Sequence, residues 1–190
     1  AIVVLIALLF SQIRKYMGKN RRGIKWVIVL ICAIVFGAIY FPPPTRHLVL
    51  KGAVLEEKDL SFISFDKGNL NKAKLKGSIF TESSFKKASL LNVDFKNAKL
   101  FKADRMESNL EGSSFINSDL SGANLFGAIL VNADFTNATL EDTMFINADL
   151  QGAKFINAFL KDTEFEKVVL KDAIFTESSF KKASLLNVDF

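Results

Sequence analysis

Residues 121–160 read SGANLFGAILVNADFTNATLEDTMFINADLQGAKFINAFL, and every residue here whose number is a multiple of five is Leu or Phe. The same spacing runs from Leu50 to Phe190, where 28 of 29 such positions are Leu or Phe. Only Arg105 interrupts it. A period of five matches neither the 3.6-residue period of an α-helix nor the two-residue period of a plain strand.

The repeating unit is Ala-x-Leu/Phe-x-Asn/Gly, as in residues 133–137, ADFTN. Residues two apart in a strand point to the same side, so the small residue and the large apolar residue both face inward. Asn and Gly tolerate positive φ and turn the chain before the next short strand. One unit buries too little to offset its backbone entropy, so the units are expected to stack.

This pattern resembles the pentapeptide-repeat family over residues 46–190. The resemblance implies an all-β solenoid, a right-handed quadrilateral β-helix in which four units make one coil of twenty residues. The sequence supports that number, because residues of one kind recur at intervals of twenty in two columns. One column is Phe95, Phe115, Phe135, Phe155 and Phe175, and the other contains Leu70, Leu90, Leu110, Leu130 and Leu150. About seven coils are expected after Leu50.

Two features depart from the regular pattern. Arg105 stands at an inward position, where an unpaired charge is costly. We expect a local bulge that turns Arg105 outward and lets Met106 help to fill the gap; the alternatives are a functional buried arginine and an error in the sequence. In addition, residues 79–95 (IFTESSFKKASLLNVDF) recur unchanged at 174–190. The offset is 95 residues, which is nineteen units and not a whole number of coils.

Charge is unevenly distributed along the repeats. Residues 67–105 carry ten basic and three acidic residues, whereas residues 106–153 carry seven acids and no base. A basic belt followed by an acidic belt suits a polar partner or antiparallel pairing with a second copy. A merely solvated surface is the simpler alternative.

The first 44 residues differ from the rest and are interpreted as a membrane anchor. Residues 26–41 (WVIVLICAIVFGAIYF) have no charge and are flanked by Lys25 and by Pro42–Pro44, as expected of a transmembrane helix. Residues 1–10 are expected to be the end of a preceding helix, and residues 11–25 a basic loop. Because positive loops stay on the cytoplasmic side, the repeats are expected on the extracytoplasmic side of the cytoplasmic membrane.

No residue grouping in the sequence points to catalysis, a cofactor or a metal. The single histidine, His47, and the single cysteine, Cys32, have no sequence neighbours that suggest a site. The sequence therefore predicts a non-enzymatic, membrane-anchored scaffold or protein-binding module whose partner it does not identify. One alternative is a DNA mimic that inhibits DNA gyrase, an activity of some soluble family members. Another is a self-associating structural rod. Nucleic-acid binding is not expected, since the basic pI comes from the loop.

Overall fold

The computed structural model describes residues 48–190, which lie in one unit of the chain, His47–Phe190. The helices and the loop expected over residues 1–10, 11–25 and 26–41 lie outside the described residues. Within residues 48–190, no helix is long and apolar enough to cross a bilayer.

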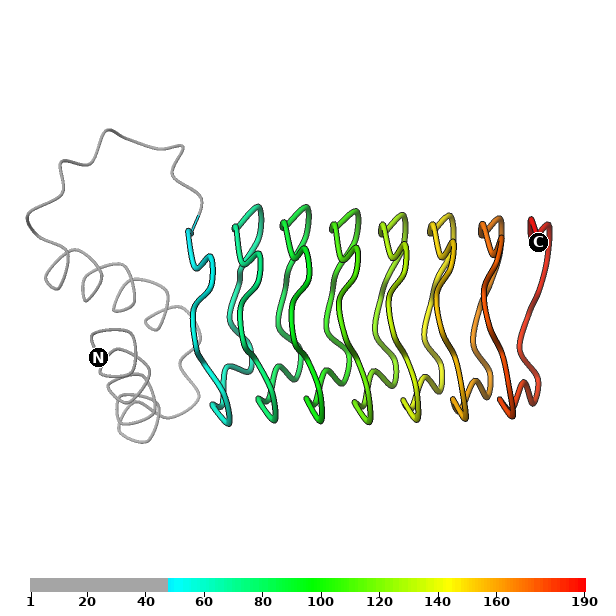
Figure 1. The fold of residues 1–190 in the computed structure, drawn as a ribbon, viewed down its shortest axis with the longest axis horizontal. Helices are drawn as coiled ribbons and strands as arrows, with labels where there is room; N and C mark the ends of the chain where they lie inside the picture. Colours follow the sequence, from blue (N-terminus) through cyan, green and yellow to red (C-terminus); the bar gives the residue numbers. More distant parts are fainter. Residues whose placement is uncertain (1–47) are drawn as a thin grey trace, which may run out of the picture. The chain divides into compact units, whose positions relative to one another are not determined.

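The described residues form a β-solenoid made of single β-bridges. No helix and no continuous strand occurs in residues 48–190; each five-residue unit has one bridge residue and two turn residues. Every one of the 25 parallel bridges joins a residue to the residue twenty positions later, from Val49↔Asn69 to Val169↔Asp189. The coil therefore contains twenty residues, and successive coils stack into a regular rod (Figure 1).

We number the coils and the faces for reference. Coil 1 is residues 51–70, and each following coil is the next twenty residues, so that coil 7 is residues 171–190. Each coil has four faces, which we number by their outward bridge residues. These rows start at Val49 for face 1, Val54 for face 2, Asp59 for face 3 and Ser64 for face 4, and repeat every twenty residues.

Backbone hydrogen bonds between coils hold this register. The N–H of Phe115 donates to the carbonyl of Asp134 at 2.7 Å, and the N–H of Asp134 donates to the carbonyl of Ser113 at 3.0 Å. A third bond, from Asn117 N–H to the carbonyl of Thr136 at 3.0 Å, ties the turn to the next coil. Because neighbouring coils satisfy the polar groups of the chain in this way, a unit is stable only inside a stack.

The turns use positive φ at the second residue after each inward Leu or Phe. Asn137 has φ 57°, and the N–H of Ala138 donates to the carbonyl of Phe135 at 3.0 Å to close the turn. Asn and Gly suit this conformation, as the sequence indicated. Lysine and glutamate also adopt it, for example Lys102 with φ 53° and Glu107 with φ 54°, so stacking overrides the local preference.

Small hydroxyl residues fit inside the coil because the turn carbonyls accept their hydrogen bonds. The Oγ of Ser113 donates to the carbonyl of Leu90 at 2.7 Å, and Thr143 Oγ1 donates to the carbonyl of Leu120 at 2.9 Å. A buried hydroxyl is costly only when it lacks a partner. This explains why Ser and Thr alternate with Ala at the small inward position.

Candidate interaction surface

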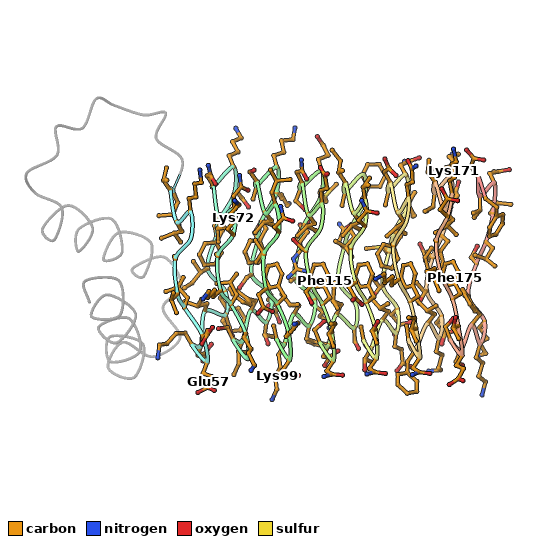
Figure 2. All side chains as sticks on the ribbon, in the orientation of Figure 1. Glu57, Lys72, Lys99, Phe115, Lys171 and Phe175 are labelled. Carbon is orange, nitrogen blue, oxygen red and sulfur yellow. The ribbon has the colours of Figure 1, made fainter. Side chains whose placement is uncertain are left out.

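The inward residues fill the rod with two kinds of column. On face 2, Phe95, Phe115, Phe135 and Phe155 are fully buried, and successive rings from Phe95 to Phe175 stack with centroids 4.7–5.1 Å apart. On face 1, the column of Leu70, Leu90, Leu110, Leu130 and Leu150 is fully buried too. In Figure 2, Phe115 and Phe175 lie within the stack, while Lys99 points away from it. The core is thus continuous along the rod, and from coil 1 to coil 6 the side chains available to a partner are the outward ones; at coil 7 the inward positions Leu185 and Phe190 are exposed as well.

Arg105 does not turn outward, and the expected bulge is wrong. Its side chain is fully buried. The backbone keeps its register: Arg105 N–H donates to the carbonyl of Asn124 at 2.8 Å, and Asp104 pairs with both Ser84 and Asn124. Because the bridges to the coil before and the coil after both remain intact, no bulge forms and the side chain of Arg105 points inward.

The guanidinium of Arg105 lies among phenylalanine rings. Its Cζ is 4.8 Å from the centroid of Phe95, 5.2 Å from Phe85 and 5.4 Å from Phe115. None of its three side-chain nitrogens has a hydrogen-bond partner. Cation–π attraction offsets part of the desolvation cost, but burial still lowers the pKa of Arg105 to about 9. The only buried charge of the described residues is therefore a source of instability.

Outward charge concentrates on two coils. Coil 2 carries five lysines and one acid, a net +4, and coil 5 carries four acids and no base, a net −4. The lysines are Lys72, Lys74, Lys76, Lys86 and Lys87, and the acids of coil 5 are Asp134, Glu141, Asp142 and Asp149. Since Arg105 is buried, it contributes nothing to the surface of the basic belt.

Many acidic and amide side chains at outward positions stabilise turns. The Oδ1 atom accepts from the N–H two residues later at Asp119, Asp134 and Asp149, with distances of 3.0–3.1 Å. Aspartate and asparagine commonly make this local bond. Their recurrence reflects turn chemistry and does not indicate a catalytic group.

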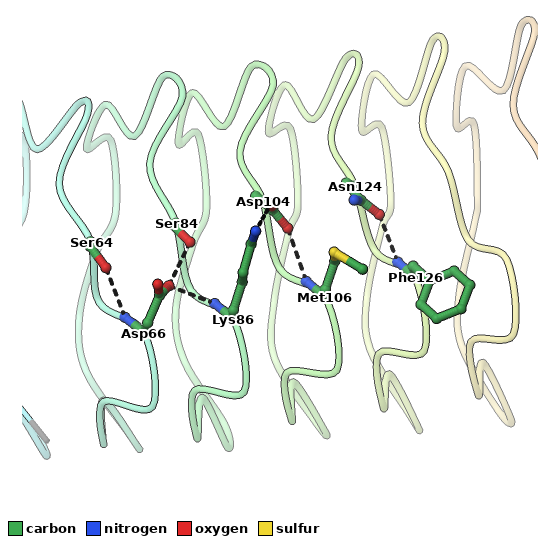
Figure 3. A network of polar contacts seen from close by, with 8 residues as sticks. All are labelled: Ser64, Asp66, Ser84, Lys86, Asp104, Met106, Asn124 and Phe126. Atoms are coloured by element: carbon green, nitrogen blue, oxygen red, sulfur yellow. Dashed lines mark hydrogen bonds and ion pairs between the residues drawn. The ribbon is translucent and has the colours of Figure 1, made fainter. Parts of the chain in front are cut away.

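Face 4 shows how neighbouring coils share polar contacts (Figure 3). Asp66 accepts from Ser84 Oγ and from the N–H of Lys86, and Lys86 Nζ lies 2.9 Å from Asp104. The side-chain hydrogen bond to Asp104, followed by its charge, raises the pKa of Lys86. Surface pairs of this kind contribute little to stability but fix side-chain directions.

Before coil 7, the exposed phenylalanines Phe62, Phe101 and Phe159 lie on face 3 or its edge toward face 4. Phe159 is 59% exposed and Phe101 is 39% exposed. Beside Phe159, a shallow groove of about 390 Å³ is lined by Thr139, Glu141, Phe159, Lys161, Ser179 and Lys181. Hydrogen bonds to Glu141 and then to Asp162 raise the pKa of Lys161, so this lysine remains charged beside the ring.

No group of three or more His, Cys, Asp or Glu side chains able to hold a metal ion occurs in the part of the chain that the structure describes.

A family model for pentapeptide repeats matches the chain in eight copies over residues 47–82, 106–142 and 143–181. The chain belongs to the pentapeptide-repeat family. No sequence among the curated proteins is significantly similar to it.

Several solved pentapeptide-repeat structures are similar to this chain. A trypsin-treated variant of QnrB1, a plasmid-mediated fluoroquinolone resistance protein, is 22% identical with a TM-score of 0.43, covering 75% of this chain and 88% of QnrB1. A protein from the Arabidopsis thaliana thylakoid lumen is 25% identical with a TM-score of 0.40, covering 64% and 77%. HetL of the cyanobacterium Nostoc, involved in regulating heterocyst differentiation, is 20% identical with a TM-score of 0.25, covering 82% and 92%.

The pentapeptide-repeat pattern itself contains the signal that the sequence interpretation missed. A phenylalanine whose number is not a multiple of five falls outside the inward columns, and in the repeats this holds for Phe62, Phe101, Phe126 and Phe159. Phe62, Phe101 and Phe159 are at least 39% exposed, and Phe126 is half-buried. Such residues mark the apolar part of the outer surface, which charge counting alone does not locate.

Proposed function

We propose that this pentapeptide-repeat protein is a non-enzymatic scaffold that presents its outer faces to a protein partner. The observation that carries the proposal is the separation of charge along a stacked rod, with a net +4 on coil 2 and a net −4 on coil 5. Regular stacking keeps these charges at fixed spacing, about 4.8 Å per coil. Solenoids provide long, regular surfaces of this kind for binding.

We further propose that residues 26–41 anchor the rod in the cytoplasmic membrane and that the repeats lie on its extracytoplasmic side. The support is the uncharged run between Lys25 and Pro42 and the six basic residues in the first 25 positions. We also infer the right-handed quadrilateral form of the coil, in keeping with the four-unit, twenty-residue period. Protease protection of the repeats in sealed vesicles tests the orientation.

DNA mimicry, the alternative function, is less well supported by the surface. A rod that imitates duplex DNA needs acidic charge along its length, whereas coil 2 carries five lysines. A protein partner with both acidic and basic segments fits this rod better.

Site-specific photo-crosslinking tests the scaffold. The end of coil 3 and coil 4 offer four matched outward positions, one on each face. They are Asn109, Ser114, Asp119 and Asn124. A photoreactive residue is placed at each position in turn in the full-length chain, and the cells are irradiated. We expect one discrete adduct from one face or from two adjacent faces. Equal yields from all four faces, or no adduct from any, would contradict a binding scaffold.

A further inference from the structure

Face 3 has outward rows with mixed aromatic and charged residues. Its central row reads Asp59, Ile79, Lys99, Asp119, Thr139, Phe159 and Ser179, and the row along its edge to face 4 reads Ser61, Thr81, Phe101, Ser121, Glu141, Lys161 and Lys181. Each row contains one exposed ring and at least one lysine, in opposite order along the rod; Phe159 is 59% exposed, and Phe101 is 39% exposed with Lys102 Nζ of the same chain 5.1 Å from its centroid. Lys99 precedes Phe159 by three coils, and Phe101 precedes Lys161 by three coils.

We infer that two copies of this chain pair antiparallel through face 3. A two-fold axis across the rods, midway between Asp119 and Thr139, places Lys99 of one copy over Phe159 of the other. The same operation places Phe101 over Lys161 in the edge row. By symmetry both contacts occur twice, giving four lysine–ring pairs. Lysine above an aromatic face is attractive, more so when the pair is partly desolvated.

The charges of face 3 select this register over its neighbours. In it, Asp119 faces Thr139 and Ser121 faces Glu141, so no like charges oppose each other in the two rows. A shift of one coil in one direction brings Asp119 against Asp119 of the other copy. A shift in the other direction brings Glu141 against Glu141. Like charges placed directly opposite disfavour an alternative pairing, which is how interfaces obtain a single register.

The shape of face 3 suits this arrangement and limits its strength. Flat β-faces pack about 10 Å apart, and six coils with three outward residues each present on the order of 300–400 Å² per copy. A standard interface buries about 800 Å² per partner. We therefore expect a weak, reversible dimer. Lys161 keeps its pairing with Glu141 in the free rod, so it is already held beside the groove.

The second copy is preferred to an unrelated occupant because the surface is self-complementary. Face 3 alternates rings, lysines and acids, and each finds its counterpart on the same face after the two-fold operation. An acidic partner would meet Asp119 and Glu141, and an apolar partner would bury Lys99 and Lys161. The inference rests on the proposed scaffold function and names one of its partners.

Sedimentation of the full-length chain over a range of concentrations tests the pairing. Phe159→Lys places a lysine over Lys99 and should raise the dimer Kd at least ~10-fold. Adding Lys99→Glu to that variant restores an attractive pair and should return the Kd to within ~3-fold of the original. Ile129→Lys on face 1 is the matched control, since Ile129 is also exposed, at 42%. Equal effects of Phe159→Lys and Ile129→Lys would overturn the inference.

Cross-linking tests the register. With Cys32 replaced by serine, a chain carrying Asp119→Cys is mixed with a chain carrying Thr139→Cys and treated with a short bismaleimide. The mixture should give a cross-linked dimer, and each chain alone should give little. Dimers from either chain alone would mean a register shifted by one coil and would overturn the assignment. A chain that stays monomeric but still gives a single-face photo-adduct with another protein contradicts the pairing and leaves the scaffold function standing.

Discussion

Two opposite columns of the core share one backbone and differ in content. The face 2 column has an uninterrupted run of five stacked rings from Phe95 to Phe175. The face 4 column begins with Phe65 and Phe85, stacked at 4.9 Å, and resumes with Phe145 and Phe165 at 5.2 Å, but Arg105 and Leu125 stand between these pairs. Coil-to-coil hydrogen bonds continue past Arg105 without a break. The backbone therefore sets the register, and the side chains set how strongly each coil is held.

The largest effect is expected from breaking the uninterrupted column. Phe135→Ala removes a ring that stacks on Phe115 and Phe155, and the rigid ladder limits collapse of the cavity. We expect a loss of about 3–5 kcal/mol in the free energy of unfolding. Guanidinium titration of the full-length chain, followed by circular dichroism, measures it. The control is Phe159→Ala, an exposed ring, expected within about 0.5 kcal/mol of wild type; equal losses would contradict the assignment of inward and outward rings.

Replacing Arg105 in the interrupted column by an apolar residue should increase the free energy of unfolding. Arg105→Leu removes a buried charge without hydrogen-bond partners and places at this site the residue type that fills most of the large inward positions. After allowing for the lost cation–π contacts, we expect a gain of about 2–4 kcal/mol. The same titration measures it, and hydrogen exchange of coils 3 and 4 should slow. Destabilisation by Arg105→Leu would mean that the guanidinium has a partner that stabilises it.

Alkaline pH should reduce the difference in the free energy of unfolding between Arg105→Leu and the wild-type protein. Burial lowers the pKa of Arg105 from its ordinary value to about 9. Below about pH 9 both folded and unfolded chains hold the proton, and the cost of burying the charge is fully present. Between about pH 9 and the ordinary pKa of arginine, the unfolded chain binds more protons than the folded chain, so the stability contributed by this group rises with pH. The advantage of Arg105→Leu should shrink by roughly 2 kcal/mol between pH 8 and pH 10.5; a constant advantage would argue against a neutralising guanidinium.

A smaller effect is expected at the turns, which serve both columns. Asn137→Ala places an alanine at φ 57° and removes the hydrogen bond that Asn137 Nδ2 donates to Asn117 Oδ1 at 3.1 Å. We expect a loss of about 1 kcal/mol. Asn137→Gly, which removes the same amide but adopts the conformation freely, should lose less. Thermal unfolding of the two variants side by side compares them.

The sequence is sufficient to deduce which side chains are inward, because a five-residue period leaves one arrangement that buries Leu and Phe at every unit. The sequence is not sufficient to deduce that the side chain of Arg105 also points inward. Sequence reasoning weighed the cost of one buried charge against a local bulge, but a bulge would also break bonds to the coils before and after. Those bonds are made by the backbone and carry no residue-specific signal. The grouping of Phe101 and Phe159 on one face was likewise missed, although their position outside the inward columns is visible in the sequence.

The two identical segments, residues 79–95 and 174–190, lie on different sides of the rod. Ile79 belongs to the face 3 row, whereas its counterpart Ile174 belongs to the face 2 row. Apart from Leu91 and its counterpart Leu186, which lie in turns, both segments nevertheless keep their Leu and Phe residues at inward positions, since any five-residue unit fits any side. Gene duplications by multiples of five residues can therefore leave the interior intact while rotating all later surface residues by quarter turns. Such a rod can acquire a new outer surface in one genetic step, without any substitution in its core.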